Sequence, residues 1–368
     1  MRNFRVRIFQ PIVPEYRVAL FEGLAERYGD NIEVWAAEKI GIDVSCPLTK
    51  MRFDYQHSFR KIGPFIWQKG LTLKGLDKGD VIVVCGDIHQ LSSLWIAFKA
   101  KCKGIKVVWW GHHVSAQAKE SKVKIRLRIA KLLSDVYLCY TDAGIDYLEK
   151  RGFAKGSVFA TGNTIDLDAV SCAKKEWDGV RKFGEKKTLL FCGVLREKVK
   201  ADVLLKALKL LKEKRYDFHC VIIGGGPMEQ EWKKMAQDIG VGSCVTWCGE
   251  LRGQRLLAPW FLSSDLFVYP GRIGLSIIHS FAFGLPVVLN DNKFDHGPEY
   301  TAFQPGVNGW SFKDGDVEDF ANTINEALDS DELELRGRAG QLFVFENYSM
   351  RKMIDRYAEA VEAARIKE

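Results

Sequence analysis

A turn with three basic residues follows the apolar run TLLFC. Gly193 opens this turn, Arg196, Lys198 and Lys200 follow, and a helical pattern begins near Ala201. A glycine lets the backbone approach a ligand closely, and the first amides of a helix together with cationic side chains suit a diphosphate. We therefore expect an anion-binding strand–turn–helix here; a solvated basic turn is the structural alternative.

A second glycine-rich turn lies in VIIGGGPMEQEW. Gly225 and Gly226 precede Pro227, which suits the first turn of a helix because proline has no amide hydrogen to leave unpaired. The pattern is not the dinucleotide-binding GxGxxG, since proline and methionine occupy the positions where that pattern continues. Two interpretations of these glycines stay open: they allow an anion to approach the backbone closely, or they form a tight strand–helix turn.

The most specific string is DLFVYPGRIGLSIIHSFAFGLPVVLND. Its apolar run ends at Pro270, and the glycine-rich turn from Gly271 to Gly274 opens an apolar helix that carries His279. Such a helix start offers unpaired amides to a ligand, although a lone histidine among apolar residues is often a core or capping residue. In the polar loop that follows, His296 and Glu299 could bond the hydroxyls of a sugar or ribose, or the loop could simply be solvated.

Short apolar runs alternate with helical-period segments along the whole chain, which is typical of parallel sheets with crossover helices. Six such runs, a polar stretch at 171–187 and six further runs predict two doubly wound α/β domains rather than one extended sheet. In such sheets ligands bind beyond the carboxyl ends of the strands. The expected division is an N-terminal domain at 1–172, a linker at 173–187, a second domain at 188–345, and a C-terminal helix at 346–368 that packs back on the first domain.

Composition narrows the classes of protein. The 368 residues are 47% hydrophobic and 27% charged, and no stretch approaches the roughly 18 apolar residues of a membrane span. The nine cysteines are scattered and several lie in apolar runs, so we expect reduced thiols and no metal site. We expect a soluble cytoplasmic protein.

The positive charge is concentrated in the first half. Residues 1–180 hold 28 Lys and Arg against 20 Asp and Glu, a net of +8, whereas the remainder holds 26 against 27, a net of −1. From Lys99 to Lys131 ten basic residues face one acid, Glu120. This predicts a polyanionic partner for the first half, and since no nucleic-acid-binding motif is present, an anionic membrane surface is favoured over nucleic acid.

The four elements of the second half, in this order, resemble those of retaining glycosyltransferases of family 4, which have the GT-B fold of two Rossmann-like domains facing a central cleft. The framework G-L-S-x-x-H-S-x-A-x-G-x-P-V-V is kept, and Glu299 matches a G-x-P-E loop. The chain departs from the family where Val194 and Val199 replace an arginine and a lysine, and where Gly271 and His279 replace the glutamates of a Glu-x7-Glu element. It thus resembles a divergent subtype.

The resemblance implies roles for particular residues. Arg196 and Lys198 would stabilise the departing diphosphate, and a histidine of the pair His112 and His113 would contact the reacting sugar. Tyr16 and Arg17 would face the acceptor. The residues expected to bind the donor are Gly193, Lys200, Gly225, Gly226, Gly249, Glu250, Gly271, Ile273, Gly274, Leu275, Ser276, His279 and Glu299.

The function expected from this resemblance is transfer of a sugar from a UDP- or GDP-sugar to a sugar or lipid-linked acceptor, with retention, in cell-surface polysaccharide or glycolipid synthesis. No metal or other cofactor is expected, because cations and helix amides would carry the electrostatic role. The alternatives are an inactive scaffold of the same fold and a sugar-nucleotide epimerase, for which no matching carboxylate set is found. A nicotinamide-dependent oxidoreductase would need the missing GxGxxG, and a nucleic-acid-binding protein remains the non-enzymatic alternative.

Overall fold

A computed structural model of the chain describes residues 4–40, 59–112, 120–180, 183–184, 186–214 and 217–367. The chain divides into two compact units. Unit 1 comprises residues 1–163 and 350–368, and unit 2 comprises residues 164–349. No helix among the described residues has both the length and the apolar character that crossing a membrane requires.

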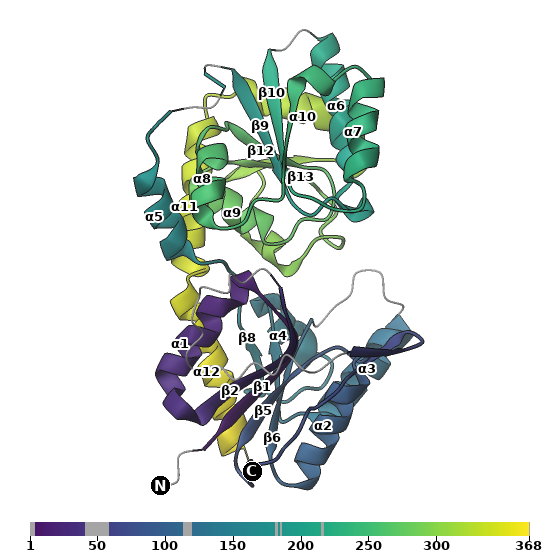
Figure 1. The fold of residues 1–368 in the computed structure, drawn as a ribbon, viewed down its shortest axis with the longest axis vertical. Coiled ribbons are helices and arrows are strands. Elements are labelled where there is room, and N and C mark those ends of the chain that lie inside the picture. The colour runs from purple at the N-terminus through teal and green to yellow at the C-terminus, as the bar shows by residue number, and fades with distance from the viewer. Residues whose placement is uncertain are drawn as a thin grey trace. The chain divides into compact units, whose positions relative to one another are not determined.

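Unit 1 is built on a six-stranded parallel sheet (Figure 1). Its strands lie in the order β2 (Ile32–Ile40), β1 (Val6–Pro14), β5 (Val81–Cys85), β6 (Lys106–Trp110), β7 (Val136–Cys139) and β8 (Val158–Ala160). Both faces of the sheet are covered, which is why the strands read as continuous apolar runs. Along β5, Val81 and Val83 enter one core while Ile82 and Val84 enter the other, as the two-residue period of a strand requires.

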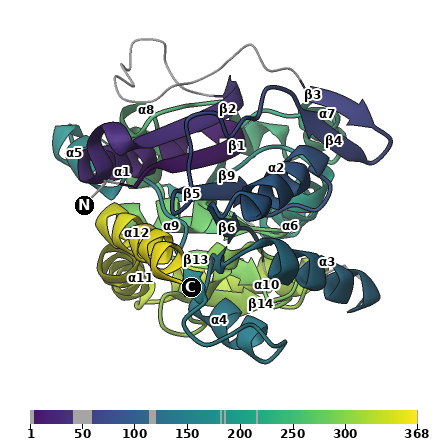
Figure 2. The same ribbon diagram turned by 90° about the horizontal axis from the view of Figure 1, so that it is seen from below.

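Helices cover the two faces of this sheet separately, as Figure 2 shows. On one face lie α1 (Val18–Tyr28) and α12 (Met350–Ile366), which pack against each other. On the other lie α2 (Leu91–Cys102) and α3 (Glu120–Leu133), followed in the chain by α4 (Asp142–Glu149). An antiparallel hairpin, β3 (Phe59–Ile62) and β4 (Phe65–Gln68), adds a feature that the alternating pattern did not predict.

Unit 2 is a second six-stranded parallel sheet. The order is β11 (Val245–Gly249), β10 (Phe218–Ile223), β9 (Lys187–Cys192), β12 (Leu266–Tyr269), β13 (Val287–Asn290) and β14 (Gly309–Phe312). The strand order reverses between β9 and β12, the position at which doubly wound sheets bind ligands. The predicted pair of Rossmann-like parallel sheets is therefore confirmed.

Two groups of helices cover the unit 2 sheet (Figure 1). One group is α6 (Ala201–Glu213), α7 (Glu229–Asp238) and α10 (Val317–Asp329). The other is α5 (Leu167–Glu176), α8 (Gln254–Leu262), α9 (Ser276–Phe283) and α11 (Leu333–Asn347). The division between units falls earlier than the expected linker at 173–187, because α5 packs against α8 and α9 of unit 2. Asp166 caps α5 by accepting a hydrogen bond from the Ala169 amide at 2.9 Å.

The described cysteines form no disulfide. Cys139 and Cys220 are buried within strands, while Cys85 and Cys192 are partly buried at strand ends. Burial raises the pKa of the Cys85 thiol to about 11 and that of Cys192 to about 12, so both remain protonated at neutral pH. These four behave as small apolar residues of the sheets.

Candidate functional site

The loops at the carboxyl ends of β9 and β10 fit together backbone against backbone. A side chain at Gly224 would overlap the carbonyl of Gly193, and one at Gly226 would lie 2.5 Å from the carbonyl oxygen of Leu195. Both Gly224 (φ 133°) and Gly226 (φ 155°) also have backbone angles that other residues rarely adopt. Gly224 and Gly226 are thus required by close packing of the two loops, which fixes the backbone geometry of this edge.

The loop after β12 is held in the same way by a short 3-10 turn, Glu197–Val199. The Arg272 amide donates to the carbonyl of Lys198 at 2.9 Å, and a side chain at Gly271 would overlap that same carbonyl. The family's glutamate would therefore not fit at Gly271 in this arrangement. The β9, β10 and β12 loops together form one interlocked edge.

Lys200 is engaged within unit 2. It adopts a left-handed conformation (φ 51°), the one described non-glycine residue with positive φ, and its Nζ donates to Asp314 Oδ1 at 2.7 Å. Asn292 donates to the other carboxylate oxygen of Asp314 at 3.0 Å. Burial acts to raise the pKa of Asp314, but the bonds from Lys200 and Asn292 hold it below its ordinary value. In this structure the Lys200 ammonium neutralises a carboxylate.

Arg196 and Lys198, unlike Lys200, have side chains that are not paired with a carboxylate among the described residues. Both side chains are exposed, and neither forms an ion pair or hydrogen bond with the residues that the structure describes. They lie on the loop that leads into the amino end of α6, where the helix dipole also favours an anion. This pair of cations is available to a ligand.

The ring of His279 is held by its own helix and by α8. Its Nε2 lies 3.2 Å from the side-chain nitrogen of Gln254, an amide donor, and the ring also bonds the backbone of Leu275. Burial lowers the pKa of His279 to about 4, so the imidazole is neutral at neutral pH. Both sides of the ring are occupied within unit 2, and its expected contact with a donor stays a prediction.

A buried polar network fixes the turn before α9. Asn290 donates to the carbonyls of Pro270 at 2.9 Å and Gly271 at 3.2 Å, and its own carbonyl lies 3.1 Å from Nε2 of His296. The other ring nitrogen of His296 accepts from the Ile273 amide at 3.2 Å. Burial lowers the pKa of His296. His296, one of the two polar residues expected to bond a sugar, is here a structural clamp on the turn.

Glu299 lies deeper than a solvated loop residue would. Its carboxylate is 4% exposed and lies 3.7 Å from where a Cβ on Gly274 would be, beside the start of α9. A carboxylate near a helix start is stabilised by the amides there. Leu275 caps α9 and Ser276 begins it.

The remaining expected donor residues lie on neighbouring loops. The carbonyl of Gly249, the last residue of β11, accepts from the Gly224 amide at 2.7 Å. Gly225 faces Glu250, which is exposed and paired with Arg252 at 2.7 Å. The structure thus brings the predicted glycines to one edge of one sheet, the carboxyl edge of unit 2.

The carboxyl edge of unit 1 encloses a pocket of about 610 Å³. Its floor comes from the ends of β5, β6 and β7, and one wall comes from α3. It is lined by Arg17, Phe65, Cys85, Gly86, Asp87, Ile88, His89, Trp110, Gly111, His112, Lys122, Val123, Ile125, Arg126 and Tyr140. Arg17 and His112, both expected to face an acceptor or reacting sugar, line this pocket. His113 lies outside the described residues.

Arg17 is the best-organised side chain of this pocket. It donates to Gln10 Oε1 at 2.7 Å and to the Tyr140 hydroxyl at 2.9 Å, and its guanidinium lies 4.3 Å from the centre of the Trp110 ring. The ring of His112 lies 4.6 Å from that of Tyr140. Tyr16 lies against the Arg17 guanidinium at 5.7 Å and does not line the pocket.

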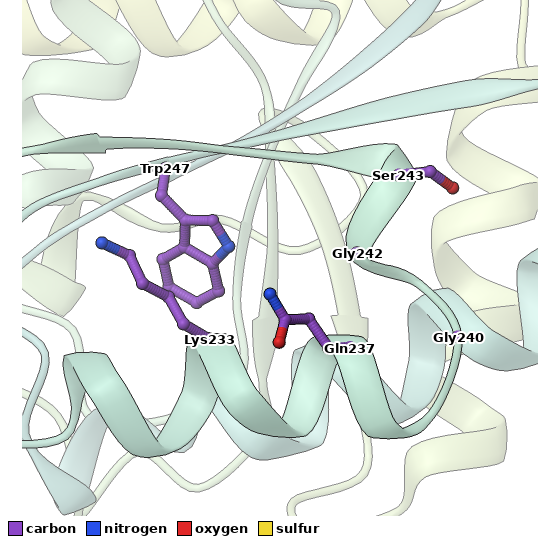
Figure 3. Close-up of a pocket in the computed structure, with 6 residues that line it drawn as sticks. All are labelled: Lys233, Gln237, Gly240, Gly242, Ser243 and Trp247. Atoms are coloured by element: carbon purple, nitrogen blue, oxygen red, sulfur yellow. The ribbon is translucent and has the colours of Figure 1, made fainter.

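A shallower hollow of about 440 Å³ lies on unit 2 between α7 and β11 (Figure 3). The indole of Trp247 stands beside the side chains of Lys233 and Gln237, and Gly242 and Ser243 close its end. Gly242 and Ser243 precede β11, so this hollow begins at the amino end of that strand, opposite to the interlocked edge. No residue expected to bind a ligand lies in it.

Among the described residues, no group of three or more His, Cys, Asp or Glu side chains is arranged to hold a metal ion.

Comparison with known proteins relates the second half of the chain to a known family. Residues 174–341 match the model of the family described as glycosyl transferases group 1. The match spans 168 of the 368 residues, just under half of the chain. The match coincides with unit 2 and its interlocked glycine loops.

Curated relatives match over a limited length. An uncharacterised glycosyltransferase of Haemophilus influenzae is 24% identical over 177 residues, 47% of this chain and 48% of its own. A GDP-mannose-dependent α-(1-6)-phosphatidylinositol monomannoside mannosyltransferase of Mycobacterium tuberculosis is 27% identical over 174 residues, 44% of each chain. The chain thus spans about half the length of these relatives.

Solved structures resemble the chain over nearly its whole length. HepE from Anabaena, solved in complex with UDP, has a TM-score of 0.70 at 14% identity. The alignment covers 98% of this chain and 99% of HepE. A glycosyltransferase from Rickettsia africae has a TM-score of 0.72 at 13% identity, with both chains fully covered. At these identities the likeness shows the fold, which is GT-B.

Several organising residues were missed from the sequence. Asn290 and Asp314 follow or lie near strand ends, but nothing local distinguishes them from loop residues. The sequence predicts Trp110 and Tyr140 only as strand residues, although each ends an apolar run and so lies at the carboxyl edge of unit 1. Position at a strand end was the available signal for these two.

Proposed function

We propose that this protein is a glycosyltransferase that moves a sugar from a UDP- or GDP-sugar to a sugar or lipid-linked saccharide acceptor, with retention at the anomeric carbon. The proposed setting is cell-surface polysaccharide or glycolipid synthesis. The family of unit 2 supports the reaction class. The Anabaena structures with UDP and UDP-glucose and the GDP-mannose-dependent mycobacterial relative support the two candidate donors.

The observation that carries the proposal is the state of Arg196 and Lys198. Both cations are exposed and unpaired within the described residues, beside the amino end of α6 and a rigid glycine edge, while Lys200 is already neutralised. When the bond between the anomeric carbon and the diphosphate oxygen breaks, negative charge grows on the diphosphate. Preorganised cations and amides at that position stabilise the charge as it develops. The acceptor oxygen bonds to the anomeric carbon, and its proton is released as the nucleoside diphosphate departs.

Other residues complete the proposed site. Gly193, Gly225, Gly226, Gly249 and the turn from Gly271 to Ser276 would present backbone to the donor, with Glu250, His279 and Glu299 near its hydroxyls. In unit 1, Arg17 and Tyr16 would face the acceptor, and His112 or His113 would bond the reacting sugar. The proposed mechanism needs no metal, because side-chain cations and backbone amides stabilise the negative charge that develops on the diphosphate.

Calorimetric binding of UDP and of GDP, in the presence of EDTA, tests the donor site. We expect one nucleotide to bind the wild type, and the double variant Arg196→Ala, Lys198→Ala to lose on the order of 100-fold in affinity, since each charged hydrogen bond contributes about 1.5–3 kcal/mol. The matched control is Lys206→Ala, Lys209→Ala, which removes two exposed cations from α6 that pair within the helix. Absence of binding by both nucleotides, or equal loss in the two double variants, contradicts the proposal.

A turnover assay separates the remaining alternatives. A transferase incubated with its sugar nucleotide and acceptor releases free nucleoside diphosphate. A sugar-nucleotide epimerase changes the donor sugar without that release, and an inactive scaffold binds the nucleotide and leaves the donor intact. We expect release of the diphosphate to depend on an added acceptor.

We propose a cytoplasmic protein that lies peripherally on an anionic membrane through the Lys99–Lys131 region of unit 1. Exposed apolar side chains accompany the cations there: Trp95, Phe98, Ile125 and Leu132 are 42%, 58%, 55% and 75% exposed. Near anionic lipid each cation contributes about 1 kcal/mol. Sedimentation with phosphatidylglycerol vesicles should exceed that with phosphatidylcholine vesicles, and Lys124→Glu with Arg128→Glu should abolish the difference. Equal binding to both vesicles contradicts the membrane proposal alone.

A further inference from the structure

The pocket of unit 1 has walls of two kinds. Phe65, Ile88, Val123 and Ile125 line it with apolar surface, and Ile125 is itself 55% exposed on α3. Arg17 lines the same pocket, beneath the ring of Trp110 and against Tyr140. A pocket that places a fixed guanidinium among apolar side chains suits a ligand with a charged end and an apolar body.

Two buried donors in this lining lack an acceptor. Both Nη atoms of Arg17 are bonded, but its Nε has no hydrogen-bond partner among the described residues, and neither does the indole Nε1 of Trp110. Buried N–H groups without an acceptor are rare in proteins because each costs the free energy of its lost hydration. Of the five N–H groups of the Arg17 guanidinium, two are bonded within the part of the chain that the structure describes, so a side chain that lines the pocket keeps donors for the acceptor atoms of a ligand.

The excess of positive charge among the lining residues indicates that the ligand of this pocket carries an anionic group. Arg17, Lys122 and Arg126 contribute positive charge, and Asp87 is the acidic residue of the lining. The Asp87 carboxylate also lies 2.9 Å from Nδ1 of His89. Three cations against one acid, with a planar guanidinium at the floor, match a phosphate group, which accepts several charged hydrogen bonds.

We propose that this pocket binds a phosphate carried on an apolar chain. The phosphate would accept from Arg17, and the chain would run along Ile88, Val123 and Ile125 toward the exposed surface of α3. This inference rests on the proposed function for its biological meaning: the lipid phosphate would be the carrier end of the sugar acceptor. The binding itself does not depend on the donor site.

Calorimetry with n-decyl phosphate, below its micelle concentration, tests the pocket. Inorganic phosphate supplies the head without the chain, and decyl maltoside supplies the chain with an uncharged head. We expect decyl phosphate to bind at least about tenfold more tightly than either, since both parts of the pocket contribute. Equal affinity for decyl phosphate and decyl maltoside, or for decyl phosphate and inorganic phosphate, overturns the proposal.

Two pairs of variants on α3 locate the site. Ile125→Glu should lower the affinity about tenfold or more, whereas Leu132→Glu, an exposed apolar residue of the same helix outside the pocket, should not. Lys122→Glu and Lys124→Glu form the corresponding charged pair, of which Lys122 alone lines the pocket. Because all four positions are exposed, these variants should fold. Equal loss within both pairs overturns the assignment.

Arg17→Met tests the head group directly. It keeps an unbranched side chain and removes the charge, so the preference for decyl phosphate over decyl maltoside should disappear. The same preparations are titrated with UDP and GDP. Nucleotide binding without decyl phosphate binding refutes this inference and leaves the proposed function standing; decyl phosphate binding without nucleotide binding refutes the proposed function and leaves the pocket assigned.

Discussion

The two units carry nearly the same parallel sheet but finish its carboxyl edge in opposite ways. In unit 2 the loops after β9, β10 and β12 meet backbone to backbone, and glycines such as Gly224 and Gly271 are what allow the approach. In unit 1 the loops after β5, β6 and β7 stand around a pocket of about 610 Å³ lined by aromatic and aliphatic side chains. One edge is closed and polar, and the other is hollow and largely apolar.

The loops, and not the sheet, therefore decide what surface each edge offers to a ligand. A closed backbone edge offers amides at fixed positions and so suits a small, highly charged group that must be held in one geometry. A hollow lined by side chains adapts to the shape of an apolar chain, with Arg17 fixing one end.

The largest effect is expected at Gly224. Its alanine variant would place a methyl group on the Gly193 carbonyl at a φ of 133°, so the β9 and β10 loops must separate. We expect a loss of about 3 kcal/mol or more in the free energy of unfolding, together with loss of nucleotide binding. Chemical denaturation followed by hydrogen exchange should assign the loss to unit 2.

Gly249→Ala is the matched control. Gly249 also lies at a strand end of unit 2 with positive φ (69°), but no atom lies within 4 Å of the added methyl group. The variant should lose only the free energy needed to hold a non-glycine residue at positive φ, about 1–2 kcal/mol. If the two variants were equally destabilised, close packing would not distinguish the unit 2 edge and the contrast between the edges would be lost.

Much of this architecture follows from the sequence. The runs VIVVC and LFVY are uninterrupted apolar stretches because both faces of each sheet are covered, so the twelve sheet strands could be predicted. The β3–β4 hairpin could not, since its strands are four residues long and mostly exposed. Helix α5 was not predicted because its second half lies in the polar stretch at 171–187, although its buried Leu167, Val170 and Ala173 follow a helical period.

The site was predictable only in part. Glycine turns after apolar runs located the unit 2 edge, because strand ends of parallel sheets meet at one side. The partners of individual side chains were not predictable, since the Lys200–Asp314 pair joins residues 114 positions apart. The unit 1 pocket was also missed as a cavity, because it is assembled from three strand ends and α3, and no local pattern records their convergence.

The next largest effect is a pH dependence at His279. Burial lowers its pKa from 6.5 to about 4 in the folded protein. Between these values the unfolded chain binds a proton that the folded chain does not, so the free energy of unfolding falls as the pH is lowered. His279→Gln should recover on the order of 1–2 kcal/mol of this loss near pH 4, after allowance for partial exposure.

Denaturant unfolding at several pH values measures how much of the free energy of unfolding is lost as His279 becomes protonated. His296 also has a lowered pKa, so the variant should retain part of the acid sensitivity. The glutamine keeps a polar group near Gln254, and the neutral-pH stability should change less than the acid-pH stability. An unchanged pH profile would mean that His279 is solvated, and the unit 2 edge would then be less closed than described.

The smallest effect is expected for the ion pair of Lys200 and Asp314. Their side chains are 32% and 25% exposed, so a double-mutant cycle with Lys200→Ala and Asp314→Asn should give a coupling energy of about 0.5–1 kcal/mol. Because the unit 2 edge is preformed, we expect the same coupling with saturating nucleotide. Loss of the coupling on nucleotide binding would show that the Lys200 ammonium turns to the diphosphate, as its predicted donor role requires. In that case the closed edge would rearrange around its ligand, and the contrast with the adaptable unit 1 pocket would narrow.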